Sequence, residues 1–154
     1  MSIADSLARV AYIIEGVEPE DRGAFVWQDR DAGQVPELEV AYEGQDRLFE
    51  LADVLTADAG EGGCVPSRVR LSVSLRIRYR VAGSRTALRA RQASDTQRLS
   101  QALMFNPADY DFAATGLDAV LVAQPGPAAP VVNPGQTVPV HEILTIPLTM
   151  EVRP

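Results

Sequence analysis

The chain has 154 residues, a formal net charge of −7 and an apolar fraction of 46%, which suit one folded domain with a sizeable core. It contains no run of about 18 apolar residues and its start, MSIADSLARV, lacks an apolar signal core, so we expect neither a membrane span nor a secretory signal. All 14 basic residues are arginine, and the net negative charge argues against nonspecific affinity for nucleic acid. The single cysteine, Cys64, excludes an intrachain disulfide and fits a reducing compartment.

The first predicted element is an amphipathic helix over residues 2–16. Ser2 and Asp5 fit a capping box, Gly16 fits a stop, and the apolar residues recur every three or four positions: Ile3, Leu7, Val10 and Ile14. An apolar stripe of this kind must be covered, so we expect the helix to pack on a sheet or on a partner.

Three short strands are predicted next. Residues 24–28, AFVWQ, form one candidate, and residues 37–43 alternate between apolar and acidic side chains. Residues 47–55 also fit a helix, but the turn-like EGQD before them favours a strand. Residues 56–67 are rich in glycine and acid and are expected to form a loop.

Residues 69–81 give the strongest signal in the chain, VRLSVSLRIRYRV. Every odd position is apolar and every even position is arginine or serine, which is the pattern of a strand with one buried and one wet face. At about 3.3 Å per residue the strand is roughly 43 Å long. We therefore expect part of it to protrude beyond its sheet neighbours.

A second helix is predicted over residues 84–105. The residues that share one side of it are Leu88, Gln92, Asp95, Leu99, Ala102 and Leu103. A strand, LDAVLVA, follows at residues 117–123.

The proline-rich segment 124–139 is predicted to lack regular structure. The last strand begins near residue 140 and alternates again, with Pro147 inside it. Because proline has no N–H, we expect this strand to lie at an edge of the sheet or to be bulged there.

The predicted order is helix, two or three strands, a long strand, helix and two strands. Most strand-to-strand connections are short, so the sheet should be mostly antiparallel, with both amphipathic helices on one face. The sequence thus predicts one α+β domain over residues 1–154, with two long loops at 56–67 and 124–139.

No catalytic, cofactor-binding or metal-binding set is predicted. His141 is the only histidine, and neither a nucleophile motif nor Cys64 lies near it in sequence. The acidic residues Asp53, Asp58 and Glu61 lack calcium-loop spacing, and one His with one Cys cannot form a zinc site. The GEGG of residues 60–63 is not a phosphate loop, because no Gly-Lys-Ser/Thr follows it.

The row of arginines on the long strand has three interpretations. The row pairs with acidic residues of another strand, for which Glu37, Glu39 and Glu43 are candidates. Alternatively it forms a protein interface, or it contacts nucleic acid, although few aromatic residues accompany it. The candidate interface residues are Arg70, Arg76, Arg78 and Arg80 of this row and Pro125, Pro127, Pro130 and Pro134 of the proline-rich segment.

Five segments together resemble the tail terminator, or tail completion, proteins of long-tailed phages and tail-like particles. They are the helix SLARVAYII, the strand DRLFEL, the long strand RLSVSLRIRYRV, the helix ALRARQASDTQRLSQAL and the closing strand ILTIPLTMEV. The resemblance covers most of the chain and rests on the order of these patterns. The proline-rich segment before the last strand departs from the family pattern.

The resemblance implies a structural virion protein of the tail or neck, assembled in the host cytoplasm. It implies a ring, usually a homohexamer, that caps the tail tube, ends tube polymerisation and joins the tail to the head connector. The partners would be further copies of the chain, the tail tube protein and the connector protein. DNA would pass through the channel without specific binding, which the acidic net charge favours.

Two other functions stay open on the sequence. One is a different neck or baseplate component with the same scaffold. The other is a small enzyme or ligand-binding domain, which would show a deep pocket with convergent polar groups.

Overall fold

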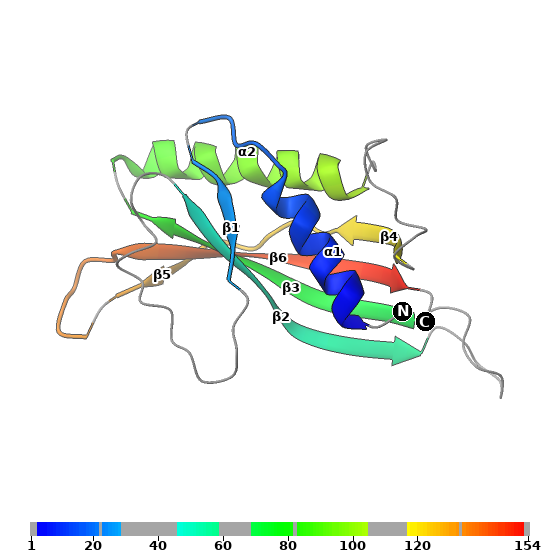
Figure 1. Cartoon of the computed structure of the whole chain (residues 1–154). Coiled ribbons are helices and arrows are strands. Elements are labelled where there is room, and N and C mark those ends of the chain that lie inside the picture. The colour runs from blue at the N-terminus through cyan, green and yellow to red at the C-terminus, as the bar shows by residue number, and fades with distance from the viewer. Residues whose placement is uncertain are drawn as a thin grey trace.

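The computed structural model describes residues 3–21, 23–28, 46–58, 69–81, 83–104, 117–132 and 134–152. Two helices and six strands follow one another along these residues (Figure 1): α1 (Ile3–Glu15), β1 (Phe25–Trp27), β2 (Arg47–Asp58), β3 (Val69–Arg80), α2 (Arg85–Met104), β4 (Leu117–Val122), β5 (Ala129–Val131) and β6 (His141–Val152). The predicted α+β fold with two helices and a mostly antiparallel sheet is confirmed.

The six strands form one curled sheet in the order β1-β2-β3-β6-β4, and β5 also pairs with β6. Only β1 and β2 run parallel, while all other pairs are antiparallel. Strand β6 therefore lies inside the sheet, between β3 on one side and β4 and β5 on the other.

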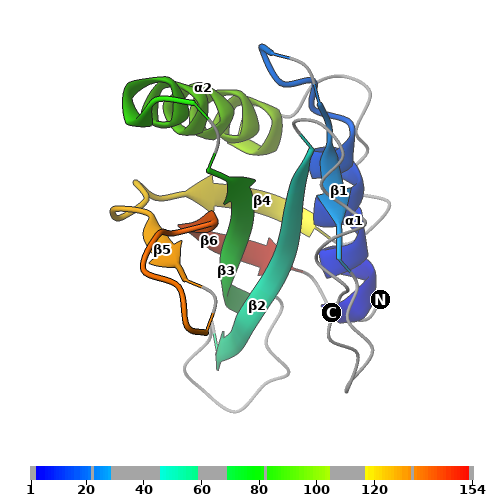
Figure 2. The ribbon, with the colours of Figure 1, turned by 90° about the vertical axis from the view of Figure 1, so that its left-hand side faces the viewer.

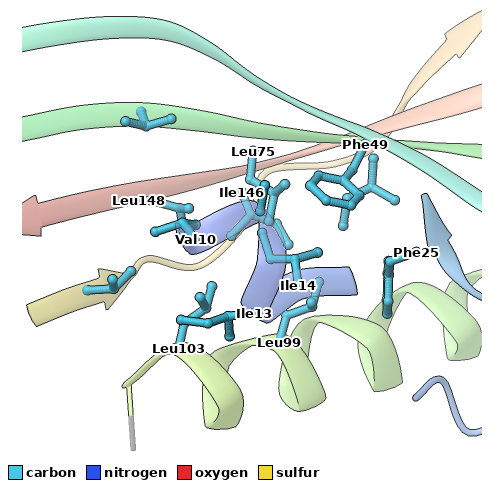
Figure 3. Close-up of a cluster of buried hydrophobic side chains, with 14 of the residues drawn as sticks. Val10, Ile13, Ile14, Phe25, Phe49, Leu75, Leu99, Leu103, Ile146 and Leu148 are labelled. Atoms are coloured by element: carbon cyan, nitrogen blue, oxygen red, sulfur yellow. The ribbon is translucent and has the colours of Figure 1, made fainter. Parts of the chain in front are cut away.

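Both helices cover the face of the sheet that carries the core. The odd-numbered residues of β3 and the even-numbered residues of β6 are paired on that face, so Leu75 lies opposite Ile146. Figure 3 shows these two side chains packed with Ile13 of α1 and Leu99 of α2. Full burial of each such side chain contributes roughly 1.5–3 kcal/mol, so this layer holds the helices on the sheet.

The helix boundaries follow from local hydrogen bonds. The Ser84 hydroxyl accepts the N–H of Ala87 at 3.1 Å, which caps the start of α2. At the end of α1, the Gly16 N–H donates to the carbonyl of Tyr12 at 3.2 Å. The buried side of α2 consists of Leu88, Gln92, Asp95, Leu99 and Leu103, which confirms the side predicted from periodicity.

Two predictions about strand length are wrong. Strand β3 does not protrude, because β6 pairs with all of it, from Val69 opposite Val152 to Arg80 opposite His141. Strand β2 continues through residues 56–58, which were expected to belong to a loop, because these residues pair with residues 69–71 of β3. The remainder of that loop, and the strand predicted at residues 37–43, lie outside the described residues.

The proline-rich segment 124–139 contains regular structure, contrary to expectation. Residues 129–131 form β5, an edge strand in which a proline nitrogen needs no ladder partner. Strands β4 and β5 both pair with β6, β4 with its C-terminal half and β5 with its start. The two strands are thus halves of one edge, interrupted by residues 123–128.

Pro147 lies in the interior strand β6, so the expectation that its strand lies at an edge of the sheet is wrong. The alternative, a bulge at Pro147, is also wrong, because its pairing with Ser74 shows no register shift. Its carbonyl accepts the N–H of Ala123 at 3.0 Å, just beyond the end of β4. The carbonyl and the nitrogen of a strand residue point to the same side. The Pro147 nitrogen therefore faces the interruption between β4 and β5 and not β3. Its lack of an N–H removes no hydrogen bond from the ladder between β6 and β3.

Candidate functional site: the outer face of the sheet

The outer face is the side of the sheet opposite the helices, and it carries the whole arginine row of β3. In the register with β6, Arg70 lies opposite Glu151 and Arg76 opposite Thr145. Arg78 lies opposite Ile143, and Arg80 lies opposite His141. The predicted alternation is confirmed, since the odd residues 71–79 are buried and the even residues are partly or fully exposed.

The first half of the row is neutralised by its neighbours. Arg70 Nη2 lies 3.5 Å from Glu151 Oε1 of β6. Arg76 binds two carboxylates of β2, with Nη2 at 2.5 Å from Asp53 Oδ2 and Nη1 at 3.7 Å from Glu50 Oε1. Cross-strand ion pairing therefore occurs for these two arginines, with Glu151, Asp53 and Glu50 as partners. The partners suggested by the sequence, Glu37, Glu39 and Glu43, lie outside the described residues.

Asp53 owes its position to an irregularity in β2. The register with β3 shifts between Ala52 and Leu55, and Asp53 adopts a left-handed backbone conformation with φ 53°. Aspartate tolerates that region better than most residues. The bulge lets Asp53 reach Arg76 and increases the local twist of β2.

The second half of the row forms a cluster that we call the basic patch: Arg78, Arg80 and His141. The Val81 N–H donates to the Val140 carbonyl at 3.0 Å, which makes Arg80 and His141 a non-hydrogen-bonded pair with closely spaced side chains. Within the described part of the chain, no carboxylate is paired with Arg78.

The charges of the basic patch act on its histidine. Burial lowers the pKa of His141 below its usual value of 6.5, and the guanidiniums of Arg78 and Arg80 lower it further. Both arginines therefore lie close enough to add their fields at one point.

Exposed apolar side chains occur in the connection that leads from β5 to His141. Val132 and Val138, in the connection between β5 and β6, are 42% and 70% exposed. Ile143 is half-buried opposite Arg78. A mixed patch of arginine and exposed aliphatic groups has the composition of a protein-binding surface more than that of a solvated strand face.

The candidate prolines occupy three different places. Pro134 lies in the turn between β5 and β6, and Pro130 lies in β5 opposite Glu142. Pro127 belongs to the interruption between β4 and β5. Pro125, also in that interruption, lines a groove of about 580 Å³ against α2, which a row of neutral polar residues borders: Gln92, Thr96, Gln97, Ser100, Gln101 and Gln124.

Both edges of the sheet carry features that oppose pairing with another strand. One edge has β1, which is three residues long, and the bulged β2. The other edge is interrupted and contains Pro125, Pro127 and Pro130. Short edge strands, bulges and prolines all obstruct edge-to-edge association. Contacts with other proteins should therefore use the faces of the molecule.

A buried ionic cluster lies on the helix side, and sequence reasoning did not anticipate it. Arg47 donates from Nε to Asp95 Oδ2 at 2.8 Å, and it also binds Asp21. The Tyr79 hydroxyl donates to the same Asp95 oxygen at 2.8 Å, while Arg91 Nε lies 2.8 Å from Asp21 Oδ2. The guanidinium of Arg47 also lies 5.9 Å from the centre of the Tyr79 ring.

Burial and charge compete within this cluster. Burial raises the pKa of the Tyr79 hydroxyl well above 10.0, and the adjacent Asp95 carboxylate raises it further. Burial also raises the pKa of Asp95, against the opposing effect of Arg47 and Tyr79. For Arg47, loss of hydration lowers the pKa, but the bonds to Asp21 and Asp95 outweigh it and the net shift is upward. The guanidinium therefore stays charged inside the protein.

A surface hollow of about 340 Å³ lies beside the ionic cluster, lined in part by Asp21, Arg91 and Asp95. The cluster does not open freely into it, since the Arg47 and Asp95 side chains are each 1% exposed. These groups bind one another, so their arrangement fastens α2 to β2 and β3.

A second buried carboxylate joins α2 to β6. Glu142 accepts two hydrogen bonds from Arg89, at 2.9 and 3.1 Å, and one from Gln92 at 3.1 Å. Its position on the core face of β6 explains why a charged residue is buried there.

The described residues contain no group of three or more His, Cys, Asp or Glu side chains that could hold a metal ion. No helix among them is long and apolar enough to cross a membrane. Comparison of the sequence with protein-family models gives no match, and a search of curated proteins also finds none.

Proposed function

We propose that the chain is a structural protein that associates head to tail with copies of itself into a ring. The ring caps a phage tail tube, ends its polymerisation and joins the tail to the head connector. The proposal starts from the resemblance of five segments of the chain to tail terminator proteins, and the outer face of the sheet adds a physical argument to it.

The observation that carries the proposal is the row of four arginines on the outer face of β3, in a chain of net charge −7. A positive surface on an otherwise negative protein attracts the negative surfaces of other copies. This attraction favours contacts between two different surfaces of neighbouring copies. Such head-to-tail contacts close into rings when the rotation between neighbours allows it. The negative charge that remains would repel phosphates, so DNA could pass through a ring without being retained.

The test is assembly with tail tubes. Tail tube protein is polymerised with and without the chain, and tube ends and lengths are measured by negative-stain microscopy, with native mass spectrometry of the chain alone. We expect ring-shaped density at tube ends and shorter tubes as the chain is added. An acidic protein of similar size serves as control. Tubes that keep their length, together with a chain that never self-associates, would contradict the proposal.

The position of the ring separates this function from the first alternative. A neck or baseplate component with the same scaffold would also form rings, but they would bind elsewhere and leave tube length unchanged. The same images therefore distinguish the two structural functions.

The ionic cluster of Arg47, Asp95 and Tyr79 is the observation that favours an enzyme or ligand-binding domain, because its pKa values are shifted beside a hollow. Each of the three side chains is 1% exposed, so a substrate would have to displace the cluster to reach it. We therefore interpret the cluster as structural.

A further inference from the structure

We infer that two copies of this chain pack one end of the outer face of the sheet against each other, around a two-fold axis that runs between β3 and β6 and parallel to them. We call this end, which lies away from Arg80, the open end. Two uncharged rows of side chains cross its strands. The first row consists of Leu55, Ser72, Thr149 and Leu121, and the second of Ala52, Ser74 and Pro147.

The two ends of the outer face differ in exposure. Leu48, opposite Arg78, is 3% exposed, so that end of the face is not accessible to a partner. In the first row of the open end, Leu55 and Leu121 are 67% and 53% exposed, and Ser72 between them is exposed as well. Figure 2 shows α1 and α2 on the core side of the curled sheet, so neither helix covers the open end. A partner that docks there removes apolar surface from water.

The two rows are suited to contact with another sheet. Alanine and serine are small, so a second sheet can approach to the usual spacing of about 10 Å. Ion pairs border the rows, Arg70 with Glu151 on one side and Arg76 with Asp53 and Glu50 on the other. The rows themselves contain no charge that would have to be desolvated when a second sheet covers them.

The strand registers make the open end complementary to itself. A two-fold axis midway between β3 and β6 places β3 of one copy over β6 of the other, and β2 over β4. Because Leu55 and Leu121 end the same row, each Leu55 then faces Leu121 of the other copy. Ser72 faces Thr149 in the same way. The two leucines at the ends of the row are therefore both covered in one symmetric contact.

The same axis matches opposite charges, which identifies a second copy as the partner. Arg70 and Glu151 lie opposite each other on β3 and β6, so the axis places Arg70 of each copy over Glu151 of the other. Arg70 is 56% exposed and lies 3.5 Å from its own Glu151, so its guanidinium can reach a second carboxylate. An axis across the strands would instead place these charges over Ser74 and Pro147. Charge complementarity thus selects the axis parallel to the strands.

The contact is small and closes on itself. Strands about 4.8 Å apart make the first row roughly 14 Å wide, and sheets that pack face to face cross at about −30°. The dimer therefore belongs to the weak class of contacts, which form at micromolar concentrations and above. A two-fold contact ends after two copies, whereas a ring needs a head-to-tail contact. The inference is consequently independent of the proposed ring.

The experiment is sedimentation equilibrium of the full chain from micromolar to several hundred micromolar concentrations. Arg70→Glu and Glu151→Arg are measured alone and as an equimolar mixture. Each variant alone should dimerise about tenfold more weakly than wild type, because four like charges meet at the axis. The mixture should recover most of the association, because the new glutamate of one variant faces the new arginine of the other. Mixing cannot restore the ion pair within a chain, so recovery measures the contact between copies.

A second pair of variants tests the leucines. Leu55→Asp and Leu121→Asp, on different strands, should each weaken the dimer about tenfold or more, because a charge is then buried against leucine. Val138→Asp is the matched control, since Val138 is 70% exposed in the connection before β6, at the other end of the sheet. It should leave association unchanged. Thermal unfolding of every variant shows whether it is folded.

Cross-linking tests the orientation. Leu55→Cys and Leu121→Cys are made separately in a Cys64→Ser background and treated with a bis-maleimide that spans the roughly 10 Å between packed sheets. A mixture of the two should give cross-linked dimers. Neither variant alone should do so, because the axis places Leu55 opposite Leu121 and not opposite another Leu55.

The outcomes separate this inference from the proposed function. A wild-type chain that stays monomeric at every concentration overturns the inference, while the tail-tube experiment still decides the ring. A dimer that both aspartate variants leave intact, or a mixture of the charge variants that fails to recover, also overturns it. If the dimer behaves as expected but tail tubes keep their length and carry no ring, the inference stands and the proposed function falls.

Discussion

Arg47 of β2 and Asp95 of α2 bind each other in the interior, with Nε 2.8 Å from Oδ2 and each side chain 1% exposed. A buried pair of this kind is costly to desolvate but far more costly to break, because removing one partner strands the other charge. The pair also holds Tyr79 through the hydroxyl bond to Asp95, so it couples three elements of the fold.

Asp95→Asn should destabilise the protein by about 3–5 kcal/mol, because Arg47 would keep its charge without this carboxylate. Urea unfolding followed by circular dichroism measures the free energy of unfolding. The control is Asp53→Asn, which removes an exposed carboxylate from the pair with Arg76 and should cost less than about 1 kcal/mol. Equal losses in the two variants would show that the buried pair contributes no more than the exposed one.

Asp53→Ala should cost about 1–2 kcal/mol, because alanine is strained at a φ of 53°. Asp53→Gly removes the ion pair to Arg76 equally but accepts that backbone conformation without strain. The glycine variant should therefore be the more stable of the two in urea unfolding. If alanine were as stable as glycine, the left-handed conformation would not be the reason for aspartate at this bulge.

Folding stability should fall as the pH drops through 6.5, by the amount that the lowered pKa of His141 implies. The unfolded chain takes up the proton near pH 6.5, whereas in the folded protein burial and then Arg78 and Arg80 delay it to lower pH. The unfolded state therefore binds more protons within that window, and the stabilising effect of the neutral imidazole, complete above 6.5, is lost below it. His141→Gln should flatten the pH dependence of urea unfolding across the window.

The same histidine offers a direct measurement, since the chain contains one His. Its imidazole signals can be followed by NMR against pH. Arg78→Gln should move the pKa of His141 back toward 6.5, because one of the three causes of the shift is removed. A pKa that stays in place would mean that burial and Arg80 account for the whole shift.

The buried side of α2 could be predicted because the spacing of residues along a helix decides which of them share a side, whether they are apolar or polar. Gln92 and Asp95 fell on that side together with Leu88 and Leu99, and all four are buried. Two polar residues on a core-facing side are themselves a signal that buried partners exist. Their partners, Glu142 and Arg47, are far away in sequence, so the pairing itself needed the fold.

Arg47 was missed because charged residues are rarely buried, and an arginine at the start of a strand is usually exposed. Nothing local distinguishes it from Arg70, which is 56% exposed in its ion pair. The arginine row on β3 shows the same limit. Its periodicity predicted the face, but only the register with β2 and β6 shows which side chains lie opposite each arginine.

The inside position of β6 has a consequence for biosynthesis. Strands β3, β4 and β5 all use β6 as a pairing partner, yet β6 follows every one of them along the chain. A nascent polypeptide that has emerged only as far as β5 therefore exposes a sheet without its middle strand. Productive folding on the ribosome must wait for residues 141–152, and until then the edge of β3 that pairs with β6 is open to chaperones and to premature aggregation.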